Sequence, residues 1–230
     1  MRTKIVYEDQ DILICHKPAG LATQSARIGQ PDVVSELKNH LAGAYLGIVH
    51  RLDQPVEGLL VFAKNKKAAA VLTRQLEAGT LHKQYCALVY GRPPESRGEL
   101  TDYLYKDGNL ARVVPEGTPG AKRAVLQYML HGVPGTAGEE NPAGELPSAG
   151  GFSCLDIHIE TGRFHQIRCQ LAHAGMPILG DQKYGTAESL EESRRQGICQ
   201  TALCAGQIRL QHPTMGREVF YEIQPNWIKP

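Results

Sequence analysis

Residues 47–63 read Gly-Ile-Val-His-Arg-Leu-Asp-Gln-Pro-Val-Glu-Gly-Leu-Leu-Val-Phe-Ala. Two apolar runs, Gly47 to Leu52 and Leu59 to Ala63, are separated by a segment that begins with Asp53 and contains Pro55 and Gly58. Short apolar runs bounded by turn residues predict strands. Asp53 is therefore expected at a strand end, where it opens a tight connection. An aspartate in this position is more often a turn residue or a helix cap than a reactive group, so its role depends on the surrounding sequence.

The segments on either side of this stretch alternate between strand and helix patterns. A helix is expected from an Asn65 cap to a stop at Gly79, and a second from a Thr161 cap to a stop at Gly175. In the second helix an apolar stripe is expected from the helical spacing of Phe164, Ile167, Leu171 and Ala174. Arg168 lies one residue from this stripe, so it is expected along the edge of the core. Strands are expected at residues 11–15, 83–90, 154–160, 203–210 and 218–223. Strands with few helices in this order predict the α+β class.

Length and composition limit the class of protein. The chain has 230 residues and no apolar run near the ~20 residues that span a bilayer, so we expect one domain over residues 1–230 and no membrane association. Residues 132–151 mix Gly, Pro, Ala and Glu without an apolar period, which predicts a long, flexible loop inserted between strands. The N-terminus lacks a secretory pattern, which indicates a cytoplasmic protein.

The net charge and the cysteine content bear on whether the protein binds nucleic acid or metal. The net charge of +1 is lower than that of dedicated nucleic-acid-binding proteins, which weighs mildly against RNA as a partner. Six cysteines form no C-x-x-C pair, and we interpret them as reduced core thiols. Cys199 and Cys204 could bind zinc only with two further ligands, and no partner pair lies nearby in the sequence. We therefore expect no metal and no organic cofactor.

Four motifs, which follow one another along the chain, provide the surrounding sequence from which the role of Asp53 can be interpreted. They are His50-Arg51-Leu52-Asp53, residues 58–64 (GLLVFAK), residues 83–87 (KQYCA) and residues 161–168 (TGRFHQIR). Together they resemble the RluA-type family of RNA pseudouridine synthases. The likeness begins at residues 5–9 with the motif at residues 17–20 (KPAG) and ends near Leu203 and residues 212–213, so it covers almost the whole chain. It corresponds to the catalytic domain alone, without the N-terminal S4 RNA-binding domain of many larger relatives.

The resemblance implies a fold and a set of site residues. The family fold is a mixed, mainly antiparallel sheet with flanking helices and a central active cleft. Asp53 matches the nucleophile, and Arg168 matches the arginine that pairs with it and keeps it ionised. Tyr85 matches a tyrosine beside the target base. Arg51 matches an arginine that contacts RNA or fills the gap left by the extruded nucleotide, and Leu203 matches an apolar residue at the pocket wall. The family gives His50 and His165 no chemical role, so both are expected to be structural, with hydrogen bonds to nearby backbone.

The implied reaction needs one carboxylate. Conversion of uridine to pseudouridine breaks the N1–C1′ bond, turns the uracil and rejoins it through C5, and Asp53 could attack the sugar or the base. The implied substrate is a loop or bulge uridine in a folded stem-loop of ribosomal or transfer RNA, bound by a monomeric enzyme. Two alternatives stay open. A catalytically silent RNA-binding protein would need neither Asp53 nor Arg168, and a nucleoside-acting glycosidase would need a second carboxylate, for which Glu57 is the candidate.

The chain departs from the family pattern at two places. The family often has Thr-Ser three and four residues after the nucleophile, where this chain has Val56 and Glu57. A histidine commonly follows the late leucine, where this chain has Cys204. Because the loop after the nucleophile lies beside the RNA entry path in the family, these departures leave the substrate subgroup undecided.

Overall fold

A computed structural model describes residues 1–25, 29–132 and 151–227, which form two compact units. The first unit comprises residues 1–84 and the chain from residue 204 onward, and the second comprises residues 85–203. The predicted inserted loop at residues 132–151 falls almost entirely outside the described residues. The expectation of a single domain stays a prediction.

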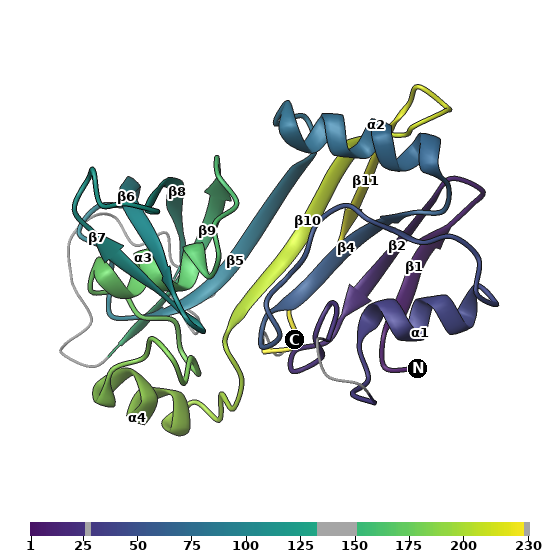
Figure 1. The fold of residues 1–230 in the computed structure, drawn as a ribbon. Helices are drawn as coiled ribbons and strands as arrows, with labels where there is room; N and C mark the ends of the chain where they lie inside the picture. The colour runs from purple at the N-terminus through teal and green to yellow at the C-terminus, as the bar shows by residue number, and fades with distance from the viewer. Residues whose placement is uncertain (26–28, 133–150, 228–230) are drawn as a thin grey trace. The chain divides into compact units, whose positions relative to one another are not determined.

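The first unit is built on a sheet with strand order β1-β2-β4-β10 (Figure 1). Its strands are β1 (Lys4–Glu8), β2 (Ile12–Lys17), β3 (Gly47–Ile48), β4 (Glu57–Ala63), β10 (Leu203–Gln211) and β11 (Glu218–Glu222), where β3 pairs with β4 and β11 with β10. Strand β10 runs parallel to β4, and the other pairings described in this unit are antiparallel. Residues 207–211 pair with residues 218–222 as an antiparallel hairpin, which is formed by the two strands predicted at the C-terminal end of the sequence.

Two helices, α1 (Val33–His40) and α2 (Lys66–Glu77), flank this sheet. Helix α2 begins as predicted, because the Asn65 side chain accepts a hydrogen bond from the backbone N–H of Ala68 (2.9 Å). Leu72 is fully buried in the core beside Ile14 and Val61. Gly79 adopts a left-handed conformation (φ +70°) that ends the helix. Helix α1 was not predicted from the sequence.

The second unit continues strand β5 (His82–Tyr90) from Tyr85 onward and has the strand order β5-β9-β8-β6-β7. These strands are β6 (Arg97–Asp107), β7 (Leu110–Val114), β8 (Lys122–Gly132) and β9 (Phe152–Ile159), and the registered pairs among β6 to β9 are antiparallel. Helices α3 (Gln166–His173) and α4 (Ala187–Arg195) complete the unit. Helix α3 packs on β6 and β7 through a small core of Leu104, Ala111, Ala124 and Cys169.

Helix α3 differs from its prediction at the N-terminal end. It starts at Gln166, not after a Thr161 cap, and the N-cap residue is His165 in a left-handed conformation. The Thr161 hydroxyl instead accepts the backbone N–H of Val125 (2.9 Å) and contacts the Gln166 side chain (2.8 Å). Phe164 precedes the helix and is 39% exposed, so it does not belong to the buried stripe. A long-range strand contact therefore replaced the local cap that the sequence pattern indicated.

The predicted α+β class and the mixed, mainly antiparallel sheet are confirmed. The central cleft stays a prediction. No described helix is long and apolar enough to cross a bilayer. The six cysteines, all within the described residues, form no disulfide. Cys199 is exposed, so the interpretation of all six as core thiols was wrong for this residue.

Candidate active site

Asp53 lies in the connection before β4 and is half-buried. The backbone on its N-terminal side is clamped by one side chain, because the Thr23 hydroxyl donates to the Leu52 carbonyl (2.9 Å) and accepts the Leu52 N–H (3.1 Å). On the C-terminal side the Val56 N–H donates to the Asp53 carbonyl (3.1 Å), which closes a turn. Both Thr23 and Leu52 are buried. The candidate nucleophile therefore stands on a backbone that is held from both sides.

Beneath this turn lies the fully buried ammonium group of Lys17. It donates to the carbonyls of Leu21 (2.6 Å), Gln54 (3.0 Å) and Pro18 (3.1 Å), so each of its three protons has an acceptor. Burial lowers the pKa of Lys17 to about 8. The negative charges of Asp53 and Glu57 act in the opposite direction, because they favour the charged form of the ammonium group. Sequence reasoning used residues 17–20 (KPAG) only as part of the family resemblance and missed this buried cation.

Glu57, the candidate second carboxylate of a glycosidase, is 2% exposed and already engaged. Its Oε1 lies 2.7 Å from His16 Nε2, and its Oε2 accepts the backbone N–H of Asn226 (3.3 Å). A carboxylate held in this way is poorly placed to activate water, so the glycosidase alternative is not favoured. The two departures from the family pattern are neighbours, since Glu57 lies opposite Cys204 in the β4–β10 register.

The two residues before Leu52 have different surroundings. Arg51 is exposed, as a contact to RNA would require. His50 is buried, and its Nε2 accepts the backbone N–H of Val61 (3.3 Å), which confirms the expected hydrogen bond to backbone. Burial, aided by the positive charge of Lys83, lowers the pKa of His50 well below its usual value. The ring is therefore neutral at pH 7.

In the second unit, Arg168 is 2% exposed and forms a two-pronged ion pair with Asp181, which is fully buried. Arg168 Nε lies 2.6 Å from Asp181 Oδ2, and Arg168 Nη2 lies 2.7 Å from Asp181 Oδ1. The carboxylate also accepts the backbone N–H of Lys183 (3.0 Å). Asp181 thus fixes the orientation of the guanidinium, a role that sequence reasoning missed. A buried arginine needs a carboxylate, but the sequence offers 24 acidic residues and no local signal for this one.

Tyr184 and His165 extend the surroundings of Arg168. The Arg168 guanidinium lies 5.1 Å from the centre of the Tyr184 ring, and the Tyr184 hydroxyl lies 2.8 Å from His165 Nδ1. The same hydroxyl accepts the backbone N–H of Ala111 (2.7 Å). His165 therefore contacts the side chain of Tyr184 through Nδ1, and its expected hydrogen bond to nearby backbone stays a prediction. The arrangement joins helix α3 to strand β7 around the arginine.

The remaining predicted residues also lie in the second unit. Tyr85 is buried on β5, and Leu203 is buried at the start of β10. Asp53 and Arg51 belong to the first unit, whereas Tyr85, Arg168 and Leu203 belong to the second. The assembly of these five residues into one site, including the Asp53–Arg168 pair, stays a prediction.

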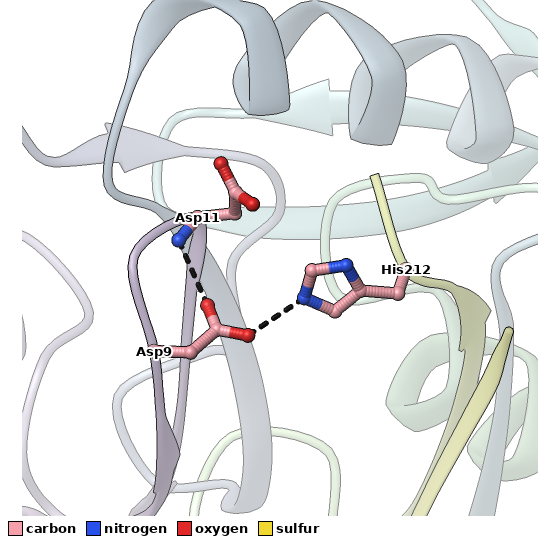
Figure 2. Close-up of side chains that lie close together, drawn as sticks. All are labelled: Asp9, Asp11 and His212. Atoms are coloured by element: carbon pink, nitrogen blue, oxygen red, sulfur yellow. Dashed lines mark hydrogen bonds and ion pairs between the residues drawn. The ribbon is translucent and has the colours of Figure 1, made fainter. Parts of the chain in front are cut away.

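A cluster of possible metal ligands lies elsewhere in the first unit, where Asp9, Asp11 and His212 come together (Figure 2). His212 Nε2 lies 2.7 Å from Asp9 Oδ2, while His212 Nδ1 accepts the backbone N–H groups of Thr214 and Met215. The Nε2 atom must then carry the proton. Both ring nitrogens are thus occupied by hydrogen bonds, which leaves no lone pair for a metal ion.

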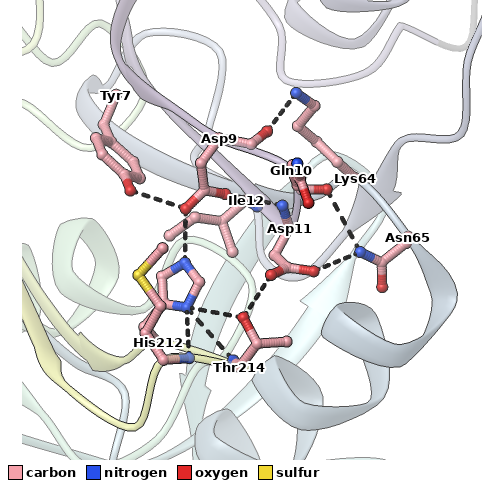
Figure 3. A network of polar contacts seen from close by, with 10 residues as sticks. Tyr7, Asp9, Gln10, Asp11, Ile12, Lys64, Asn65, His212 and Thr214 are labelled. Carbon is pink, nitrogen blue, oxygen red and sulfur yellow. Dashed lines mark hydrogen bonds and ion pairs between the residues drawn. The ribbon is translucent and has the colours of Figure 1, made fainter.

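The polar network around this cluster connects three loops (Figure 3). Asp11 accepts hydrogen bonds from Asn65 before α2 and from Thr214 in the β10–β11 turn. Burial opposes ionisation of Asp9, but hydrogen bonds from the backbone of Ile12 and Asp11, from Tyr7 and from His212 outweigh it and lower the Asp9 pKa to about 2. The cluster is therefore a structural tie between loops.

Comparison with known proteins identifies the family. The sequence model of the family described as RNA pseudouridylate synthase matches residues 11–173. The chain is 32% identical over 216 residues to the RNA pseudouridine synthase YhcT of Bacillus subtilis, covering 91% of this chain and 64% of that protein. It is 37% identical over 215 residues to an RNA pseudouridine synthase of Chloroflexus aurantiacus, covering 88% and 59% respectively. The chain thus spans less than two thirds of the length of these two relatives.

A solved structure, the human RNA Pseudouridylate Synthase Domain Containing 1, shares the fold with a TM-score of 0.72 at 24% identity, over 97% of this chain and 83% of that one. Another relative, the ribosomal large subunit pseudouridine synthase D of Zymomonas mobilis, is 30% identical over 96% of this chain and 68% of its own length. The chain belongs to the RNA pseudouridylate synthase family, and the RluA-type resemblance is confirmed.

Proposed function

We propose that this protein is an isomerase that converts uridine to pseudouridine in RNA, with Asp53 as the nucleophile. The observation that carries the proposal is the Asp53 turn, clamped at Leu52 by Thr23 and held at Gln54 by the buried Lys17. A carboxylate on such a rigid support loses little conformational freedom when it attacks, which is the requirement of nucleophilic catalysis. Its place within the HRLD motif of a family of pseudouridine synthases supports the same role.

The other site residues have proposed parts in one reaction. Arg168, oriented by Asp181, pairs with Asp53 and keeps it ionised in a poorly hydrated site. Tyr85 stacks on the uracil and assists removal of the C5 proton, and Leu203 forms the apolar wall beside it. Arg51, which is exposed, contacts the RNA backbone or occupies the place of the extruded nucleotide.

The proposed substrate is a folded RNA whose target uridine lies in a loop or bulge. Relatives named for the large ribosomal subunit make ribosomal RNA the first substrate to test, and a transfer RNA stem-loop the second. We propose that the protein acts in the cytoplasm and as a monomer.

Tritium release from RNA labelled at uridine C5 tests the proposal, because formation of the new C5–C1′ bond expels the C5 proton. The wild-type protein and a Glu77→Ala control, which removes an exposed acid on α2, should release tritium. Asp53→Ala should release none while unfolding at the same urea concentration as the control. Equal release from Asp53→Ala would refute the nucleophile. RNA binding by the wild type without tritium release would favour the catalytically silent alternative.

A further inference from the structure

The second unit has a small pocket that none of the proposed catalytic residues lines. Its volume is about 200 Å³, and three cationic side chains, Lys106, Lys122 and Arg163, stand around it with the ring of Phe164. Leu104 and Ala111 supply its apolar floor. We call this feature the cationic pocket.

Strand register explains why the cations meet. Lys122 on β8 lies opposite Leu104 on β6, and Lys106 on β6 lies opposite Ala111 on β7. Since side chains alternate along a strand, Leu104 and Lys106 point to the same face of the sheet. Leu104 is buried there in the core beneath α3, whereas Lys106 lies farther along the strand and is exposed.

The loop before α3 forms the other wall, and its backbone is fixed. The Arg163 N–H donates to Gln166 Oε1 (2.9 Å), and the Arg163 Nε–H donates to the carbonyl of Arg123 (2.9 Å). Phe164 stacks on His165 with ring centres 3.8 Å apart. Lys106 Nζ in turn lies 4.9 Å from the centre of the Phe164 ring, a cation–π distance that restrains the ammonium group.

The positive charge of the pocket is not neutralised by the protein. Across residues 1–25, 29–132 and 151–227, no carboxylate forms an ion pair with Lys106, Lys122 or Arg163. The acid next to Lys106 in sequence, Asp107, pairs with Arg112 instead (2.7 Å). Three uncompensated cations around one cavity repel one another, so an anion that enters the pocket is stabilised by all three.

We infer that the cationic pocket binds a phosphodiester group of the RNA substrate. The inference rests on the proposed function, which makes RNA the partner. Pockets that enclose drug-sized molecules measure about 300–1,000 Å³, so this smaller volume suits one phosphate with part of its sugar. Arg163 offers a planar pair of donors to phosphate oxygens, and the two lysines add point charges. Such an interaction positions the strand without reading its sequence.

The salt dependence of RNA binding measures this interaction directly. The double variant Lys106→Gln/Lys122→Gln is compared with Lys4→Gln/Lys38→Gln, which removes the same charge from two exposed lysines of the first unit. The probe is the same RNA, labelled at uridine C5, that is used for tritium release. The slope of log Kd against log salt should fall by about 0.7–0.9 for each phosphate that the pocket variant no longer neutralises. This slope should change less in the control variant. Phe164→Leu should raise the Kd for RNA, as the pocket variant does.

Three outcomes would overturn the inference. The first is an equal slope of log Kd against log salt for the pocket variant and the control, and the second is a Kd that neither Phe164→Leu nor the pocket variant changes. The third is displacement of the RNA by polyglutamate as readily as by competing RNA. The last result would assign the pocket to acidic peptides. The test is independent of catalysis, because it reads binding alone. Absence of tritium release from the wild type together with the expected slope change would refute the proposed isomerase and leave the pocket as an RNA-binding site.

Discussion

Replacement of Thr23 by valine isolates the clamp on the candidate nucleophile. Valine has the shape of threonine but lacks the hydroxyl, so neither hydrogen bond to Leu52 can form. The Leu52 N–H and carbonyl would then be buried without a partner, and each such group costs about 1–3 kcal/mol. Because the added methyl group recovers part of this cost, we expect the free energy of unfolding to fall by about 2–4 kcal/mol.

Urea unfolding followed by circular dichroism measures this decrease as a lower midpoint at an unchanged slope. Tritium release should fall more than stability alone explains, since a shift of the neighbouring Asp53 by about 1 Å can cost about 100-fold in rate. Thr23→Ser is the matched control, because serine keeps the hydroxyl and lacks only one buried methyl group. It should retain most of the activity and lose about 1 kcal/mol of stability.

The clamp would be refuted by a Thr23→Val variant that unfolds within about 0.5 kcal/mol of the wild type, the range of ordinary surface substitutions. A serine variant as slow in tritium release as the valine variant would also contradict it. In that case the methyl group and not the hydroxyl would support the Asp53 turn.

Three further predictions concern other parts of the structure. Asp181→Asn removes the charged carboxylate that holds the buried Arg168 in a two-pronged ion pair, and it should cost about 3–5 kcal/mol in urea unfolding. Gly58→Ala should cost about 2–4 kcal/mol, because Gly58 has φ +143° and an added Cβ would lie 2.6 Å from the Ala205 backbone nitrogen. The Asp9 pKa of about 2 lies below its ordinary value of 3.8, so the unfolded chain takes up the proton first as pH falls. Stability worth about 2 kcal/mol, present near neutral pH, should therefore be lost between about pH 5 and pH 2.

Each of these has a control within the chain. Asp107→Asn breaks an exposed pair with Arg112 and should change stability by less than about 0.5 kcal/mol. Gly79→Ala has φ +70° with no atom near the added Cβ, so it should cost less than Gly58→Ala. Asp9→Asn should flatten the acid limb of the stability curve. An equal loss of stability for Asp181→Asn and Asp107→Asn, or for Gly58→Ala and Gly79→Ala, would contradict the corresponding argument. An acid limb that Asp9→Asn leaves unchanged would contradict the third.

Local sequence was sufficient for much of the fold. The strand after Asp53, the helix between Asn65 and Gly79 and the two C-terminal strands were all predicted, because alternation, caps and turns depend on residues close together in the chain. The apolar run before Asp53 was predicted as a strand up to Leu52, but β3 ends at Ile48, so Asp53 does not lie at a strand end. The motifs around Asp53 and Arg168 were sufficient to indicate the family. Helix α1 and α4, and the antiparallel strands β6 to β8, received no such assignment from their sequences.

Tertiary structure decided which groups meet. Arg168 pairs with Asp181, Lys17 with three carbonyls, Thr23 with Leu52, and Asp9 with His212, which lies 203 residues away. Each partner was chosen by strand register and burial, since a buried charge or polar group must take the complementary group that packing brings within reach. The chain contains many groups of each kind, and a linear pattern does not rank them. For the same reason the cationic pocket, which is lined by residues of strands β6, β7 and β8 and of the loop before α3, has no counterpart in any single stretch of sequence.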